Sequence, residues 1–161
     1  MANLYVTITE EITLPNNNLE KTYNFKVIEG VNEIVRRVNT IATNFSGSGI
    51  EILRFCDSRE EQTGGGFVKA DVKYVRITNL SQTYTTVIYL LDVNNESTLL
   101  NLSPGKSLML NDADFNASST KDYMDESFVD EMYYSSFVYI DSIKAKAIGG
   151  TAQLEYFVAS S

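Results

Sequence analysis

The sequence contains no histidine and no tryptophan, and only one of its 161 residues is a cysteine. Without histidine the chain cannot build a Ser-His-Asp triad, a Cys-His pair or an imidazole metal site. A single cysteine, Cys56, can neither close an internal disulfide nor form a thiolate zinc site. We therefore predict that the protein is not an enzyme. Because Cys56 lies in an apolar stretch, we expect its thiol to be buried and inert.

Positive charge and long apolar runs are also scarce. Thirteen basic residues face 21 acidic ones, for a formal net charge of −8, and Arg36-Arg37 is the only adjacent basic pair. Such a surface repels phosphate backbones and anionic lipids, so we predict neither nucleic acid nor a membrane as a partner. No apolar run approaches the ~20 residues that span a bilayer. The N-terminus lacks the features of a signal peptide, so we expect synthesis in a cytoplasm.

What the sequence does contain is the pattern of β-strands. Ten Tyr, eight Phe and 43% hydrophobic residues suit pleated surfaces around a core. Residues 4–9 alternate between apolar and more polar side chains, and residues 23–27 form a second alternating run that we expect to end at Glu29-Gly30. Residues 31–42 also match helical spacing, but their β-branched side chains favour a strand, with a helix as the alternative.

The second half of the chain continues this pattern. Residues 86–91 are apolar on both faces, which predicts a central strand. Residues 99–102 and 106–110 flank Ser103-Pro104-Gly105, which predicts a hairpin. Residues 143–147 alternate small or aliphatic side chains with lysines, which is typical of an edge strand.

These segments together predict the fold class. We expect about ten to twelve short strands at roughly 8–12-residue spacing and no strong helix, which favours an all-β, antiparallel β-sandwich, jelly-roll-like, with a barrel as the alternative. The length fits a single β-sandwich domain over residues 1–161, or a domain with a short accessory hairpin. A long acidic loop is expected near residues 111–127.

A metal-binding motif is only partly present in that loop. Asp112, Asp114 and Asn116 have the alternating oxygens with which a calcium loop begins. Ala117 lies where such a loop needs glycine, and Tyr123 lies where it needs a bidentate glutamate. We therefore predict no metal and no cofactor, and we interpret the segment as a solvated acidic loop.

Aromatic residues are densest just after the acidic loop. Tyr133, Tyr134, Phe137 and Tyr139 lie within seven residues of one another. Adjacent Tyr133 and Tyr134 cannot both point inward from a regular strand, and tyrosine is enriched at protein interfaces. We predict that these four residues form an interface, while core filling by alternate members is the competing interpretation.

Several segments resemble a known class of proteins. They are residues 72–79, residues 102–107, the opening residues 2–7 and the ending residues 154–159. Together these segments resemble small structural proteins of tailed bacteriophages, especially those of marine bacteria. The resemblance implies a β-sandwich virion component that forms a homo-oligomer, with a trimer as one possible form. It carries no active-site motif and therefore implies no functional residues.

Three functions follow as hypotheses. The first is a virion structural protein, most specifically a capsid decoration or cement protein bound to the outer shell. The second is a tail, neck or fibre-adaptor component. The third is a carbohydrate- or receptor-binding β-sandwich module that would use Tyr133 and Tyr134 together with the oxygens of residues 112–116. The first two place the protein in the virion, beside other capsid or tail subunits, after synthesis in the cytoplasm of a bacterial host.

Overall fold

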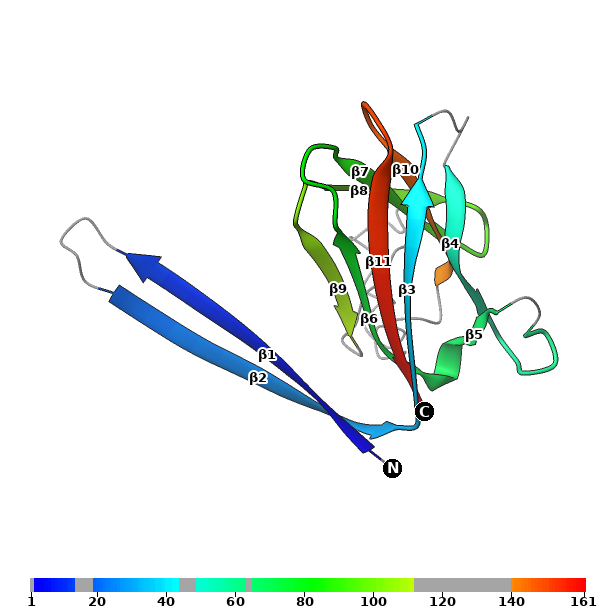
Figure 1. Cartoon of the computed structure of the whole chain (residues 1–161). Coiled ribbons are helices and arrows are strands. Elements are labelled where there is room, and N and C mark those ends of the chain that lie inside the picture. Colours follow the sequence, from blue (N-terminus) through cyan, green and yellow to red (C-terminus); the bar gives the residue numbers. More distant parts are fainter. Residues whose placement is uncertain (1, 14–18, 44–48, 63–64, 112–139) are drawn as a thin grey trace, which may run out of the picture.

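A computed structural model describes residues 2–13, 19–43, 49–62, 65–111 and 140–161 of the chain. These residues form three sheets and one helical turn, η1 (Lys69–Asp71) (Figure 1). The strands are β1 (Ala2–Thr13), β2 (Leu19–Val31), β3 (Glu33–Ile41), β4 (Ile50–Cys56), β5 (Phe67–Val68), β6 (Val72–Asn79), β7 (Thr86–Asp92), β8 (Ser97–Leu102), β9 (Ser107–Asn111), β10 (Ile140–Ala147) and β11 (Ala152–Ser160). The prediction of an all-β chain with antiparallel sheets is confirmed; the two-residue strand β5, parallel to β4, is the one exception among the described pairs.

Strands β1 and β2 form a long two-stranded sheet, which we call the arm. The arm projects away from the other strands (Figure 1). The alternation predicted for residues 4–9 and 23–27 is confirmed by the pairing of Thr7 with Phe25. The predicted end at Glu29-Gly30 is wrong, because β2 continues to Val31. Gly30 has a φ of +73° at a register shift, and glycine permits such a bulge without ending the strand.

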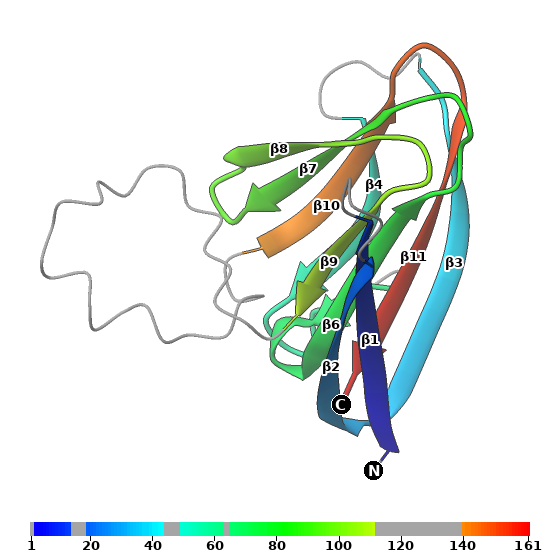
Figure 2. The same ribbon diagram turned by 90° about the vertical axis from the view of Figure 1, so that its left-hand side faces the viewer.

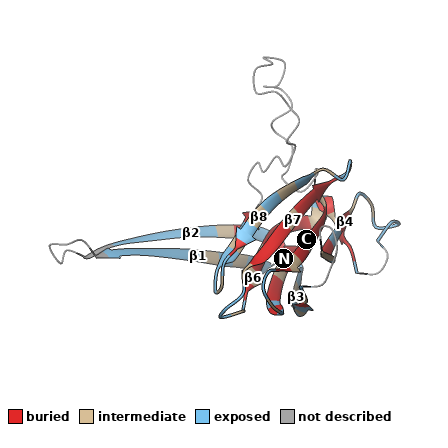
Figure 3. Ribbon diagram, turned by 90° about the horizontal axis from the view of Figure 1, so that it is seen from above, coloured by how far each residue is buried: buried red, intermediate tan, exposed pale blue. Residues whose placement is uncertain are grey.

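The remaining strands form two sheets, which we call the body. The strand order is β5-β4-β10-β7-β8 in the five-stranded sheet and β3-β11-β6-β9 in the four-stranded sheet (Figure 2). Alternate side chains of both sheets meet in one hydrophobic core, and the buried residues lie along the facing strands (Figure 3). The largest fully buried side chains are Phe55, Ile41, Ile77, Ile88, Leu90, Ile140, Ile143, Leu154, Val75 and Val158.

The strands of the body pair in a nested order, from the two ends of the body sequence toward its middle. Leaving out the short β5, the first strand pairs with the last, as β3 does with β11, and the second with the next to last, as β4 does with β10. The third pairs with the sixth, β6 with β9, and the two middle strands β7 and β8 pair with each other. The body chain is therefore arranged as one long hairpin whose paired strands are distributed over two sheets.

Two predicted strands are confirmed in type and position. Residues 86–91 belong to β7, which lies between β10 and β8 and is buried at every residue except the half-buried Tyr89. Residues 31–42 contain β3, so the strand interpretation is confirmed over the helical one. In β3, Val35 packs against the core, whereas Ile34 and Val38 point to the opposite, outer face and are exposed.

Two predictions about strand neighbours are wrong. Residues 99–102 and 106–110 do not form a hairpin, because β8 pairs with β7 and β9 pairs with β6 in the other sheet. The connection between them crosses from one sheet to the other, and the Gly105 N–H donates to the Asn79 carbonyl at 2.9 Å. The segment 143–147 is not an edge strand either, since β10 lies between β4 and β7. Its lysines mark the outer face of a central strand.

Asn79, at the end of β6, fixes this crossing. Its side chain is fully buried, and Nδ2 donates to the carbonyls of Tyr84 at 2.8 Å and Leu102 at 2.9 Å. Its Oδ1 accepts from the Ser81 N–H at 3.0 Å. One side chain thus satisfies three backbone groups from two connections, which is how a buried amide stabilises loops that lack a ladder of their own.

Candidate interaction surface

One face of the arm is aromatic and open to solvent. Tyr5, Tyr23 and Phe25 lie on the same face, and they are 68%, 63% and 75% exposed. Lys21 lies over the Tyr23 ring at 5.5 Å and forms a 3.1 Å ion pair with Glu11. Aromatic side chains this exposed leave a large apolar area in water, which is a feature of protein interaction sites.

The opposite face of the arm carries an aliphatic stripe, which we define as Leu4, Val6, Ile8 and Ile12 of β1. The first two residues of the stripe are half-buried, and the last two are exposed. Glu10 interrupts the stripe between Ile8 and Ile12, and the stripe is only half covered in the folded chain. Its uncovered half is the part of the arm that lies farther from the body (Figure 1).

The base of the arm packs on the outer face of the four-stranded sheet. Ile28 and Val31 of β2 are buried together with Tyr74 and Ala159 in a small cluster separate from the main core. Leu4, Val6 and Phe157 are the partly buried members of this cluster. The contact anchors the arm at one end only, since Tyr23 and Phe25 farther along the arm remain exposed.

The same outer face carries a cluster of two arginines and one glutamate. Glu155 has a side chain that is only 6% exposed, and its carboxylate accepts from Arg36 Nε at 2.7 Å and from Arg76 Nη2 at 2.9 Å. The hydrogen bond from Arg36 is the largest influence and lowers the pKa of Glu155; burial opposes it, and Arg76 lowers the pKa further. Two guanidinium groups and one carboxylate leave the cluster with an excess positive charge.

Phe157 connects this charge cluster to the base of the arm. The Arg76 guanidinium lies over the Phe157 ring at 5.5 Å, and the Tyr74 ring meets Phe157 edge-on at 6.0 Å. The Arg76 Nε is buried without a hydrogen-bond partner among the described residues. Around these residues the outer face stays apolar and open, because Ile34, Val38 and Met109 are exposed.

A narrow groove lies in the angle between the arm and the body. Its volume is about 150 Å³, and its lining includes Ile8 and Phe25 from the arm and Tyr74 and Met109 from the body. The lining is mainly apolar, so the groove suits an aliphatic or aromatic side chain rather than a polar ligand. The groove and the outer face form one continuous surface.

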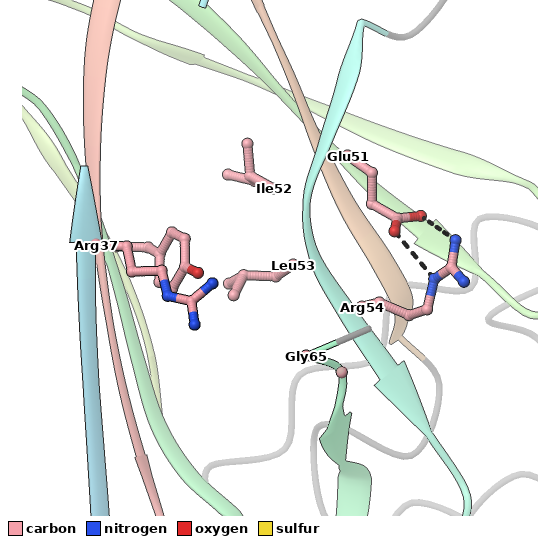
Figure 4. Close-up of a pocket in the computed structure, with 8 residues that line it drawn as sticks. Arg37, Glu51, Ile52, Leu53, Arg54 and Gly65 are labelled. Atoms are coloured by element: carbon pink, nitrogen blue, oxygen red, sulfur yellow. Dashed lines mark hydrogen bonds and ion pairs between the residues drawn. The ribbon is translucent and has the colours of Figure 1, made fainter. Parts of the chain in front are cut away.

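A second concavity opens between β3 and β4, at the side of the body where the two sheets separate. It has a volume of about 430 Å³, and Arg37 points into it from β3 (Figure 4). On the side of β4 that faces away from Arg37, Glu51 and Arg54 form an ion pair at 2.9 Å (Figure 4). Leu53 and Tyr156 contribute core side chains to the cleft wall. The cleft offers one guanidinium without an ion pair among the described residues, and its lining holds no nucleophile beside a base.

Two groups with chemical reactivity lie outside these surfaces. Cys56 is partly buried rather than fully buried as predicted, and its Sγ lies 3.4 Å from the Phe67 carbonyl. Burial is the main influence that raises the pKa of the Cys56 thiol, which disfavours the nucleophilic thiolate. Lys69 has a side chain that is 5% exposed, with ion pairs to Asp57 at 2.9 Å and Asp141 at 3.8 Å. Its charge is held by carboxylates, as buried cations require.

The site residues predicted from the sequence cannot be placed. The interface candidates Tyr133, Tyr134, Phe137 and Tyr139, the metal candidates Asp112, Asp114 and Asn116, and most of the acidic segment 111–127 lie outside the described residues. Within the described ranges, no three His, Cys, Asp or Glu side chains are grouped closely enough to hold a metal ion. These candidates therefore remain predictions.

Comparisons with known proteins give no relative of this chain. No family model, no curated protein and no solved structure matches it. Among the described residues, there is no helix of the length and hydrophobicity that crossing a membrane requires.

Sequence reasoning missed the arm as a functional surface, although a signal was present. Residues 4–12 and 21–28 carry aliphatic or aromatic side chains on both faces of each strand, with charged residues between them. A strand with one buried face normally alternates cleanly between apolar and polar residues. Apolar residues on both faces, beside Glu10 and Glu11, depart from that pattern and were the available signal.

Proposed function

We propose that this protein is a structural subunit of a larger protein assembly and that it binds its neighbours through the arm. The observation that carries the proposal is an arm with exposed apolar side chains on both faces, anchored only at its base. An isolated two-stranded sheet is marginally stable in water, and large exposed apolar patches mark interaction sites. A partner that covers the arm would resolve both problems.

We further propose that the body is a jelly-roll β-sandwich. The nested pairing of β3 with β11, β4 with β10, β6 with β9 and β7 with β8 supports this, because folding one long hairpin into two sheets produces a double Greek key. Jelly rolls occur in viral capsid proteins, lectins and cupins. The fold alone does not choose among these functions, so the arm and the resemblance to phage proteins decide our preference.

The assembly that we propose is the virion of a tailed bacteriophage, with the protein as a capsid decoration or cement protein on the outer shell. The resemblance in residues 2–7, 72–79, 102–107 and 154–159 supports a virion component. An apolar arm suits this role, because many weak contacts are multiplied by the symmetry of a shell. The partners would be capsid subunits and further copies of this chain. A trimer is one form that the homo-oligomer would take.

Co-sedimentation with phage particles tests this function. Particles that lack the protein would be mixed with the wild-type chain or with an arm-shortened variant, in which an Asn-Gly turn replaces residues 9–23 between Ile8 and Asn24. These two residues are paired in the arm, and Asn-Gly favours a two-residue hairpin turn. We expect the wild-type chain to sediment with the particles and the shortened variant to remain in the supernatant. Equal sedimentation of both proteins would contradict the role of the arm.

Copy number separates the two virion hypotheses. Decoration of a closed shell requires on the order of hundreds of copies, whereas rings and fibres of a tail require tens or fewer. Quantitative staining of purified virions gives this number. Absence of the chain from purified virions would contradict both, and binding to a glycan array would then favour the carbohydrate-binding alternative.

A further inference from the structure

Two uncovered surfaces of the chain have matching patterns. On the outer half of the aliphatic stripe, Ile8 and Ile12 lie on either side of Glu10. On the outer face of β3, Ile34 and Val38 lie on either side of Arg36. Both patterns place an apolar, a charged and an apolar side chain at alternate positions of one strand, and the central charges are opposite in sign.

The charges of the two surfaces are complementary beyond this single pair. Glu10 has no ion pair with a described residue, whereas Arg36 belongs to the cluster in which two arginines share Glu155. One more carboxylate would neutralise the positive excess of that cluster. It would also gain a charge-assisted hydrogen bond from Arg36, whose side chain is 67% exposed and within reach.

The two surfaces of one chain do not meet each other. The arm leaves the body at its base and extends away from the four-stranded sheet (Figures 1 and 3). The base of the arm already uses the sheet near Tyr74 and Ala159. Ile8 to Ile12 and Ile34 to Val38 are both four residues apart along a strand, which is about 14 Å. The free part of the arm therefore matches the length of the exposed pattern on the sheet of a neighbouring molecule.

We propose that the arm of one copy docks on the outer face of the four-stranded sheet of a second copy. Ile8 and Ile12 would pack against Ile34 and Val38, and Glu10 would pair with Arg36. This inference rests on the proposed function and names the partner of the arm. The contact joins two different patches, so it is completed either by reciprocal exchange between two copies or by a closed ring.

Cysteine cross-linking between two differently labelled copies tests the docking directly. In a Cys56→Ser background, one full-length protein would carry Ile12→Cys and the other Val38→Cys. Sheets packed face to face lie about 10 Å apart, beyond the ~7 Å between Cα atoms that a direct disulfide spans, so a short bis-maleimide is the cross-linker. It gives a mixed dimer only where the arm of one copy reaches the sheet of the other. The matched control replaces Ile12→Cys with Thr9→Cys, because Thr9 lies on the opposite face of the arm.

We expect the mixture of the Ile12→Cys and Val38→Cys proteins to give about tenfold more mixed dimer than the Thr9→Cys mixture. Equal yields of mixed dimer from both mixtures would overturn the docking geometry.

Charge reversal gives a second, independent readout on the protein without added cysteines. Glu10→Lys should weaken self-association at least about tenfold in sedimentation equilibrium, since it places a lysine against Arg36. Glu11→Lys makes the same change of charge on the opposite face of the arm and should weaken it much less. Equal effects of the two substitutions would overturn the inference.

A wild-type chain that stays monomeric at all concentrations would also overturn it. That result is distinct from failure of the proposed function, because a monomer that still sediments with phage particles uses its arm on a different protein.

Discussion

The arm and the body both contain strands with period-two alternation, but the apolar side chains are buried in the body and exposed in the arm. In the body, alternation at every second residue places Val75 and Ile77 of β6 in a core that a second sheet closes. In the arm, the same alternation leaves Ile12 and Phe25 in water, because no second sheet of the described chain lies opposite them. Period-two patterning therefore defines the faces of a strand, and tertiary structure determines whether each face becomes core or interface.

The polar groups of the two regions also differ in burial: those of the body are buried and have partners, whereas those of the arm are exposed. The body buries Asn79, Glu155 and Lys69, each with charged or backbone partners. Among its described residues, the arm has one surface ion pair, between Lys21 and Glu11, of the kind that contributes little to stability. The body is therefore specified by satisfied polar groups as well as by its core, and the arm depends on whatever covers it.

The largest contrast is expected from truncating an isoleucine in each region. Ile143→Ala removes a fully buried side chain from the centre of β10, so unfolding in urea should show a loss of about 3–4 kcal/mol. Ile12→Ala, on the exposed arm, should change the free energy of unfolding by less than about 0.5 kcal/mol. Both are measured at concentrations where the chain is monomeric. Comparable losses would mean that the arm and the body form one cooperative core.

The next largest loss of stability is expected from removing the buried amide of Asn79. Asn79→Ala leaves the carbonyls of Tyr84 and Leu102 without their donor in a buried setting, which should cost about 2–3 kcal/mol in the same unfolding measurement. Asn101→Ala, at an exposed position of β8, is the matched control and should have little effect. If the two substitutions were equally mild, Asn79 would not be the residue that fixes the crossing between the sheets.

The ion cluster on the outer face predicts a pH-dependent effect. Glu155→Gln should destabilise the protein by about 2 kcal/mol at pH 7, because two charged hydrogen bonds are weakened. Since the folded pKa of Glu155 is lowered, its contribution is complete above the ordinary carboxyl pKa and is lost as the pH falls through the folded value. In urea unfolding between pH 7 and pH 3, the free energies of unfolding of wild type and Glu155→Gln should therefore approach each other as the pH falls.

The control for this pH effect lies in the arm. Glu11→Gln breaks the exposed ion pair with Lys21 and should change stability by no more than about 0.5 kcal/mol. A difference between wild type and Glu155→Gln that stays constant down to pH 3 would show that the lost stability comes from packing and not from the charge of Glu155.

The smallest effect is expected from shortening the arm. The variant with Asn-Gly in place of residues 9–23 keeps Leu4, Val6 and Ile28, which anchor the arm to the body. The free energy of unfolding of the monomer should therefore stay within about 0.5 kcal/mol of the wild-type value. A large loss of stability would show that the outer arm supports the fold and would remove the reason to assign it to a partner.

The sequence predicted strands well where the pattern is local. The strand predictions for residues 4–9, 23–27 and 86–91 are correct, because side-chain alternation and β-branched residues report on strand formation directly. The errors concern neighbours. The turn residues Ser103-Pro104-Gly105 predicted a hairpin, yet a turn specifies only a change of direction, and the pairing of β9 with β6 joins segments about thirty residues apart.

The candidate site was less predictable. The density of aromatic residues in the segment 133–139 predicts an interface there. That segment lies outside the described residues, so the prediction is not tested. The structure reveals two separate surfaces: the arm, with Tyr5 and Phe25 exposed, and the outer face of the four-stranded sheet, with Val38 and the Arg36–Glu155–Arg76 cluster. Arg36 and Glu155 are 119 residues apart, so no local pattern could have joined them.

By itself, the sequence determined that this chain is built from strands, because alternation, aromatic content and turn residues act over a few residues at a time. Only the tertiary structure decided which strands become neighbours and which apolar faces stay open. Pairing and burial depend on contacts between distant segments, and identical alternation therefore gave a closed core in one region and an exposed arm in the other.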